Sequence, residues 1–229
     1  MGDKDTMGIQ EAAQTQTAYR AWDDQWQSET GRAEWLDPDV DVASAVPLLR
    51  SRGAQRVLDL GCGVGRHACF FASAGFQVDA MDASASGLDY AAEQAGQLGL
   101  DIAFRDGLMT LLPYPDNSFD YVLSFNVIYH GDSGVVARAI SEIHRVLKPG
   151  GLFHGTMLSK RNGNYGRGKQ VAPNTFVIDG AEGDKIHPHF YCNAAELVKL
   201  FEDFELLSLF DREHEKPGTY HWHLIAERE

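Results

Sequence analysis

The nine residues from Val57 to Gly65 (VLDLGCGVG) constrain the fold of this chain more than any other segment. An apolar stretch runs directly into three glycines at alternate positions, and a helix-like segment follows them. Glycine permits a sharp turn and leaves no side chain between the backbone and a ligand, while the next helix begins with unpaired N–H groups. The segment therefore predicts a strand, turn and helix that bind a nucleotide-like ligand at the carboxyl edge of a sheet.

The sequence after this turn alternates short apolar or β-branched runs with helical stretches, which is typical of repeated βαβ units. We expect parallel strands at residues 56–60, 77–81, 101–104, 119–125 and 152–158. Two last strands, 205–211 and 219–226, flank Lys216-Pro217-Gly218 and predict an antiparallel hairpin. The predicted fold is a doubly wound α/β domain whose mostly parallel, seven-stranded sheet has an antiparallel last strand.

Residues 1–52 are predicted to form an N-terminal helical cap or lid, and residues 53–229 a Rossmann-like domain. Within residues 10–28, Tyr19, Trp22 and Trp26 recur at helical spacings and give one face of the predicted helix an aromatic character. An insertion at about residues 159–190 is rich in Gly and Asn. We expect it to lack regular structure and to serve a function, as long connectors in compact domains often do.

Composition limits the partners and the location. The formal net charge of −13 disfavours binding to nucleic acid, and no apolar run is long enough to span a membrane. The polar N-terminus does not resemble a signal peptide, and the odd count of three cysteines without a CxxC pair argues against a disulfide framework. A cytoplasmic location is expected.

The residues around the glycines favour one ligand over another. In a dinucleotide-binding fingerprint the sixth position is a glycine, but Arg66 stands there. Asp59 lies two residues before Gly61, where a carboxylate would repel a pyrophosphate but attract a cation. S-adenosylmethionine carries an ammonium and a sulfonium, so it suits this turn.

At this point the chain resembles the class I methyltransferase family, whose first motif corresponds to VLDLGCGVGRH. The resemblance runs from about Val57 to Leu158. It includes LPYPDNSFDYVLSFNVIYH, which is similar to the fourth motif, and Arg145 to Gly151 (RVLKPGG), which is similar to the bridge into the fifth strand. The resemblance implies S-adenosylmethionine as cofactor, bound by Asp59, Gly61, Gly63, Gly65, Asp82, Ala83, Asp106, Gly107, Phe125 and Trp26.

Among these residues, the resemblance assigns the ribose hydroxyls to Asp82, the adenine amino group to Asp106 and the methionine part to Asp59. Trp26 would belong to an aromatic lid that faces the sulfonium through cation–π contact. The reaction implied is methyl transfer to a small-molecule acceptor through N, O or S, which releases S-adenosylhomocysteine.

Four residues are candidates for the acceptor pocket on position alone: Tyr129, His130, His187 and His189. Two histidines at the spacing of His187 and His189 could share a metal, but the sequence places no third ligand, so we expect no metal site. The alternatives are an NAD-dependent oxidoreductase and a non-catalytic regulator that binds S-adenosylmethionine. The sequence does not specify the oligomeric state.

Overall fold

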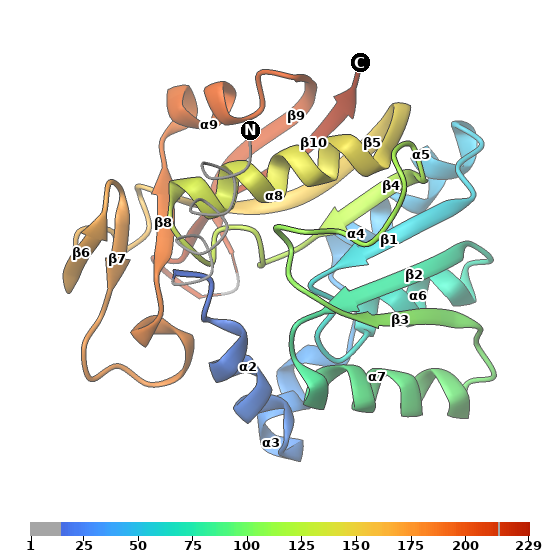
Figure 1. The fold of residues 1–229 in the computed structure, drawn as a ribbon, viewed down its shortest axis with the longest axis horizontal. Coiled ribbons are helices and arrows are strands. Elements are labelled where there is room, and N and C mark those ends of the chain that lie inside the picture. The colour runs from blue at the N-terminus through green and yellow to red at the C-terminus, as the bar shows by residue number, and fades with distance from the viewer. Residues whose placement is uncertain (1–14, 215) are drawn as a thin grey trace, which may run out of the picture.

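The computed structural model describes residues 15–214 and 216–229 (Figure 1). Its main sheet follows the order β3-β2-β1-β4-β5, and β10 and β9 continue it beyond β5. The first five strands are parallel, whereas β10 runs antiparallel to both β5 and β9. The strands are β1 (Arg56–Leu60), β2 (Gln77–Asp82), β3 (Ile102–Asp106), β4 (Phe119–Ser124), β5 (Leu147–Ser159), β9 (Phe204–Glu213) and β10 (Tyr220–Arg228). The predicted fold class is confirmed.

Helices cover both faces of this sheet. One apolar core lies between the sheet and α4 (Val40–Ser44), α5 (Val46–Ser51), α6 (Arg66–Ser73) and α7 (Ala85–Gln97). The other lies against α8 (Ser133–Val146) and α9 (Ala194–Leu200). Because β1 and β4 are buried on both faces, their residues form nearly continuous apolar runs, as in other parallel sheets.

The N-terminal segment forms short helices beside the carboxyl ends of the strands (Figure 1). They are α2 (Tyr19–Trp26), α3 (Glu29–Arg32) and the 3₁₀ helix η1 (Ala33–Trp35). The helix predicted over residues 10–28 is found from Tyr19 onward, and residues 10–14 lie outside the described residues. Gly31 was expected to break the helix, but it lies inside α3, where its amide donates to the Ser28 cap.

The insertion after β5 is more regular than its composition predicted. It contains β6 (Lys169–Ala172), β7 (Thr175–Val177), the 3₁₀ helix η2 (Gly183–Ile186) and β8 (His189–Cys192). β7 pairs antiparallel with β6 and β8, and β8 continues parallel to the end of β5. Strands of three or four residues are too short to leave a clear periodicity, so the expectation of irregular structure was wrong.

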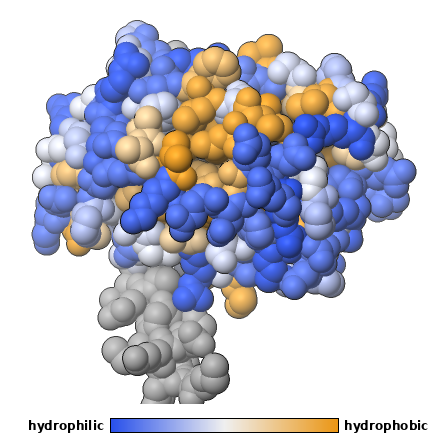
Figure 2. All heavy atoms as spheres, turned by 90° about the horizontal axis from the view of Figure 1, so that it is seen from above, coloured by the Kyte–Doolittle hydropathy of each residue, from blue (hydrophilic) through white to orange (hydrophobic). Residues whose placement is uncertain are grey.

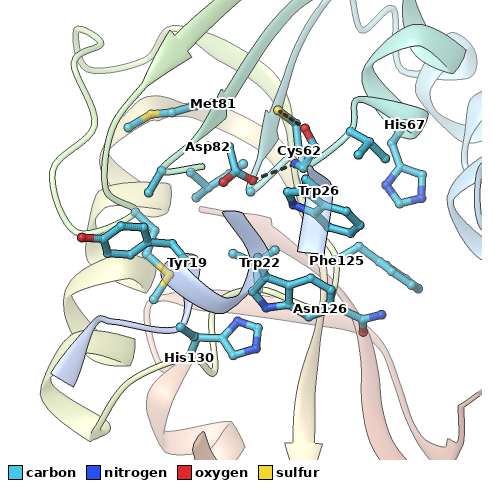
Figure 3. Close-up of a pocket in the computed structure, with 18 of the residues that line it drawn as sticks. Tyr19, Trp22, Trp26, Cys62, His67, Met81, Asp82, Phe125, Asn126 and His130 are labelled. Atoms are coloured by element: carbon cyan, nitrogen blue, oxygen red, sulfur yellow. Dashed lines mark hydrogen bonds between the residues drawn. The ribbon is translucent and has the colours of Figure 1, made fainter. Parts of the chain in front are cut away.

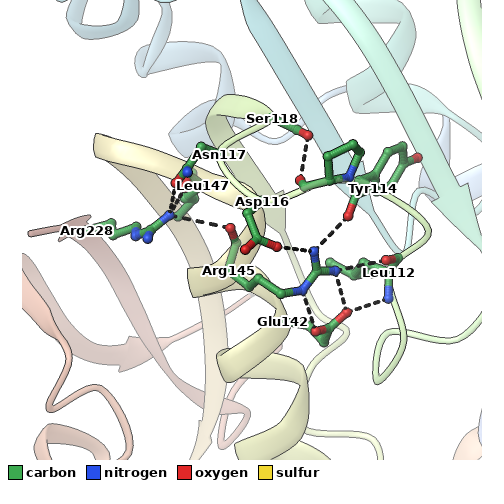
Figure 4. Close-up of polar contacts among 10 residues, drawn as sticks. Leu112, Tyr114, Asp116, Asn117, Ser118, Glu142, Arg145, Leu147 and Arg228 are labelled. Carbon is green, nitrogen blue, oxygen red and sulfur yellow. Dashed lines mark hydrogen bonds and ion pairs between the residues drawn. The ribbon is translucent and has the colours of Figure 1, made fainter.

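In the motif at residues 145–151, Arg145 has a structural role (Figure 4). Its guanidinium donates to Glu142 and Asp116 and to the backbone carbonyls of Leu112 and Tyr114. The hydrogen bond from Arg145 is the main reason why the pKa of Glu142 is lowered. This network fixes the loop before β4 to α8 and so holds the strand register near the pocket.

The face seen in Figure 2 is mainly hydrophilic, with apolar residues gathered in one part of it. Within residues 15–214 and 216–229, no helix has the length and apolar character required to cross a membrane.

Candidate active site

A pocket of about 870 Å³, its open mouth included, lies at the carboxyl ends of β1, β2 and β4 (Figure 3). This is where α/β sheets usually bind ligands. Its lining includes predicted and unpredicted residues: Gln16, Ala18, Tyr19, Trp22, Trp26, Trp35, Leu60, Gly61, Cys62, Gly63, Val64, Arg66, His67, Met81, Asp82, Ala83, Gly107, Met109, Phe125, Asn126, Val127 and His130.

The glycine turn forms one wall of the pocket. Gly61, Gly63 and Gly65 all have positive φ angles, at 77°, 51° and 79°. A Cβ atom on Gly61 would overlap the side chain of Val127, so that position requires glycine for space as well as for conformation. Gly65 does not line the pocket: a Cβ there would lie 2.6 Å from that of Ala91, so its absence lets α6 approach α7.

Asp82 connects the glycine turn to the next helix. Its Oδ2 accepts a hydrogen bond of 2.7 Å from the Gly63 amide, and its Oδ1 accepts one of 2.8 Å from the Ser84 amide. Burial raises the pKa of this carboxyl group, while the two amides oppose the shift. Asp82, Ala83 and Gly107 all line the pocket, so these three predicted residues lie where a ribose and an adenine could be held.

The other two predicted acids do not line the pocket. Asp59 is only 1% exposed, and its Oδ2 has no hydrogen-bond partner among the described residues. Burial raises the pKa of Asp59 to about 7. Asp106 is exposed at the end of β3, where it pairs in register with Asp82. Direct contact of either acid with a cofactor remains a prediction.

The aromatic side chains of the N-terminal helices cover the pocket, as Figure 3 shows for Trp22 and Trp26. The rings of Trp22 and Trp26 stack at 5.1 Å, and Trp35 meets both edge-on. Trp26 packs on Gly63 and Gly87, next to the glycine turn. We call Trp22, Trp26 and Trp35 the aromatic lid.

One carboxylate fastens the aromatic lid to α7. Oδ1 of Asp23 in α2 accepts hydrogen bonds of 2.9 Å from the Ser84 hydroxyl and the Ser86 amide. The bond from the Ser86 backbone is the main cause of the lowered pKa of Asp23. Because Ser84 also caps α7 by accepting from Gly87, the contact joins the lid directly to a helix start.

His130 lines the far end of the pocket, in the loop between β4 and α8. The helix cap is supplied by Asp132, whose side chain accepts from Gly134 and Val135, so the His130 ring is not used as a cap. That ring lies 6.3 Å from the ring of Trp22, and burial lowers its pKa to about 4. His130 is therefore a neutral imidazole at neutral pH.

The other three predicted acceptor residues lie behind His130 and do not line the pocket. Tyr129 is buried with its ring 4.6 Å from that of His130, and His189 is 2% exposed. His130 and His189 pair as an antiparallel β-bridge, which brings the insertion against the end of β4. His187 contacts the N-terminal segment, with its Nδ1 2.8 Å from the Thr17 hydroxyl.

Asp184 is the residue at this end that sequence reasoning missed. Its Oδ2 lies 3.2 Å from Nε2 of both His130 and His189. The sequence considered His187 with His189 and placed no third ligand, whereas in the fold Asp184 of η2 lies beside His130 and His189. The signal was weak, since an acid five residues before a histidine is common in a loop.

Comparison with known families and proteins links the pocket to a known domain. Residues 57–151 match the model of a methyltransferase domain. The chain is 33% identical over 164 residues to a sterol 24-C-methyltransferase of Pneumocystis carinii, covering 68% of this chain and 41% of that protein. It is 31% identical over 114 residues to an uncharacterized methyltransferase of Bacillus subtilis, covering 49% of this chain and 44% of that protein. The chain thus spans less than half the length of these two relatives.

Solved structures share the fold. A 1,6-didemethyltoxoflavin N1-methyltransferase of Burkholderia thailandensis, bound to its substrate and S-adenosylhomocysteine, has a TM-score of 0.68 at 22% identity and covers 92% of this chain and 88% of that one. A methyltransferase of Methanosarcina mazei has a TM-score of 0.67 at 22% identity, covering 80% and 97%. Residues 57–151 therefore form a methyltransferase domain, and the fold of the chain is that of solved methyltransferases.

Proposed function

We propose that this protein binds S-adenosylmethionine and transfers its methyl group to a small-molecule acceptor with an N, O or S nucleophile, releasing S-adenosylhomocysteine. One observation carries the proposal: a single covered pocket has the glycine turn and Asp82 at one end and the neutral His130 at the other. Of the predicted lid at residues 1–52, residues 15–52 are described and would cover the pocket, while residues 1–14 lie outside the described residues; residues 53–229 would be the catalytic domain.

The end of the pocket at the glycine turn fits the cofactor. The missing side chains at Gly61 and Gly63 leave the backbone open to a ligand, and Asp82 can accept hydrogen bonds from ribose hydroxyls in addition to those it already has. The aromatic lid presents indole faces, which attract a cationic sulfonium. The bound cofactor supplies an electrophilic methyl group.

The His130 end fits the acceptor. Methyl transfer is an in-line displacement and depends mainly on the position of the nucleophile. Neutral His130 can accept the proton of an acceptor hydroxyl, thiol or ammonium group. Tyr129 and His189 pack behind it and would position its ring, and His187 would hold the lid through Thr17.

The net charge and the free cysteines support the proposed acceptor class and the proposed cytoplasmic location. A net charge of −13 disfavours nucleic acid as the acceptor. All three cysteines are free, which fits a reducing compartment such as the cytoplasm. The family relatives act on varied acceptors by name, so the acceptor must come from experiment.

Titration calorimetry with S-adenosylmethionine, S-adenosylhomocysteine and NAD tests the cofactor. We expect saturable binding of the first two at one site and none of NAD. Binding of NAD without binding of S-adenosylmethionine would instead support a nicotinamide-dependent oxidoreductase.

A screen of amines, phenols and thiols for release of S-adenosylhomocysteine tests the reaction. We expect turnover with at least one class and its loss in His130→Ala, with His144→Ala as the control on the outer part of α8. Cofactor binding without turnover on any acceptor would support the non-catalytic regulator.

A further inference from the structure

Three side chains from separate segments converge behind the wall of the pocket. His130 comes from the loop after β4, Asp184 from η2 and His189 from β8. Their ligand atoms all lie within 4.8 Å of one another. The side chains are only 10%, 12% and 2% exposed, so the cluster is shielded from bulk water.

The positions of the protons leave one contact of this cluster without a donor. Nδ1 of His189 lies 2.8 Å from the carbonyl oxygen of His187, so it must carry a proton and donate it. In neutral His189 the lone pair is then on Nε2, which faces the carboxylate oxygen Oδ2 of Asp184 at 3.2 Å. Two acceptors at this distance need either a second proton on the imidazole or a metal ion between them.

The arrangement matches metal coordination in two respects. A ligand histidine usually donates its other ring N–H to a carbonyl or carboxylate, as His189 does to His187. Bonds of about 2.0 to 2.1 Å to a tetrahedral ion place neighbouring ligand atoms roughly 3.3 Å apart, close to the observed 3.2 Å.

Lys185 is the nearest other charged group. Its Nζ lies 2.8 Å from Oδ1 of Asp184, the oxygen that does not face the histidines. It therefore fixes the carboxylate with Oδ2 directed toward both imidazoles.

We propose that His130, Asp184 and His189 bind one divalent transition-metal ion of the zinc type, with an open coordination position toward the acceptor end of the pocket. Two imidazoles and one carboxylate suit zinc, cobalt or iron rather than magnesium, which prefers oxygen ligands and water. His130 both belongs to the cluster and lines the pocket, so an ion there adjoins the acceptor.

The role of the ion rests on the proposed function. An open position would bind the oxygen or sulfur of the acceptor and make its O–H or S–H group more acidic, with the proton leaving to water. When the ion is bound, His130 acts as its ligand, and water replaces it as the proton acceptor considered above. Amine acceptors, which bear their proton on a cationic nitrogen, would gain less from the ion.

Metal analysis of tag-free protein tests the site without the cofactor. Protein stripped with EDTA is dialysed at pH 7.5 against Zn²⁺, Co²⁺ or Mg²⁺, and bound metal is measured by elemental analysis. We expect about one equivalent of zinc or cobalt and no magnesium. Asp184→Asn and His189→Gln should each weaken zinc binding at least 100-fold, whereas His144→Gln, outside the cluster, should not change it.

Wild-type protein alone provides a second readout that does not depend on the folding of variants. Bound Co²⁺ should give the intense visible absorption of a low-coordinate nitrogen and oxygen site, and added zinc should displace it. No cobalt spectrum, or zinc binding that is equal in wild type, Asp184→Asn and His189→Gln, would overturn the proposal and leave a hydrogen-bonded cluster that binds no metal.

Calorimetry with S-adenosylmethionine on the same samples separates this inference from the proposed function. Cofactor binding without metal binding refutes the metal site alone. Metal binding without cofactor binding refutes the proposed function and leaves the metal site standing.

Discussion

The two ends of the pocket are built in different ways. The glycine end consists of one continuous segment, residues 57–65, whose backbone makes the site and whose Gly63 amide donates to Asp82. The histidine end consists of side chains from the β4 loop, η2 and β8, which are far apart in the chain. The first end depends on local conformation, and the second depends on the docking of the insertion.

This difference predicts separate sensitivities. A change at the glycine end should impair cofactor binding and leave metal binding intact, and a change at the histidine end should do the opposite. Four changes are considered in order of decreasing expected effect: two act on the glycine end or its partner Asp82, one on a buried histidine of β5 outside both ends, and one on the aromatic lid.

The largest effect is expected from Asp82→Ala. The change removes a carboxylate that can make two charge-assisted hydrogen bonds to a ribose, each worth about 1.5 to 3 kcal/mol. Affinity for S-adenosylmethionine measured by calorimetry should fall at least 100-fold, while zinc binding stays unchanged. Asp101→Ala, at an exposed acid before β3, is the matched control. An unchanged affinity in Asp82→Ala would remove this residue from the site.

The second largest effect is expected from Gly61→Ala, which should destabilise the glycine end. A non-glycine residue at positive φ costs about 1 to 2 kcal/mol, and overlap with Val127 adds about 1 to 3 kcal/mol. Gly75→Ala is the control, because Gly75 also has positive φ but has open space around its Cβ position. Urea denaturation should show a greater loss of unfolding free energy for Gly61→Ala. Equal losses would show that Val127 moves aside freely.

Lowering the pH should reduce the free energy of unfolding through the buried histidines of the sheet. Burial lowers the pKa of His154 to about 4, below the value of about 6.5 in an unfolded chain. As pH falls from 6.5 to 4, the unfolded state gains a proton that the folded state does not. The contribution of His154 to the free energy of unfolding is therefore fully present above pH 6.5. It falls by about 1.4 kcal/mol per pH unit between pH 6.5 and 4.

The variant His154→Asn isolates this contribution. Urea denaturation between pH 7 and 4 should show a shallower loss of stability than in wild type. His144→Asn, at a partly exposed position, should change the slope less. Parallel curves for wild type and His154→Asn would contradict the buried neutral state of His154.

Asp23→Ala should have the smallest effect and should act on both ends together. It removes the acceptor of two hydrogen bonds that tie α2 to α7, which corresponds to about 1 to 2 kcal/mol. Affinity for S-adenosylmethionine should fall roughly tenfold, and Asp24→Ala, at the adjacent exposed acid, should leave it unchanged. Quenching of tryptophan fluorescence on ligand binding measures both variants.

Sequence reasoning was most successful where structure follows from neighbouring residues. The strand before Gly61 was predicted with the observed bounds, and the turn and the helix after it were predicted as well, because glycine spacing and apolar runs act locally. The parallel direction of the main strands followed from the βαβ pattern, and β10 and β9 form the predicted antiparallel hairpin.

It failed where contacts join distant segments. The role of Asp184 depends on the position of η2 beside His130, and no periodicity in residues 159–190 predicts that contact. Gly65 was predicted to touch the cofactor, but its neighbour is Ala91 in α7. Trp35 and Met109 line the pocket through tertiary packing alone.

The position of the N-terminal helix α2 has a consequence for the turnover rate. Trp26 in α2 packs on the glycine turn, Trp22 lies beside His130, and Thr17 just before the helix contacts His187. One element therefore covers both substrate positions, and neither position can be uncovered independently by moving it. Such an enzyme would load both substrates while open and release both products by the same opening, so its turnover rate would be limited by one shared motion.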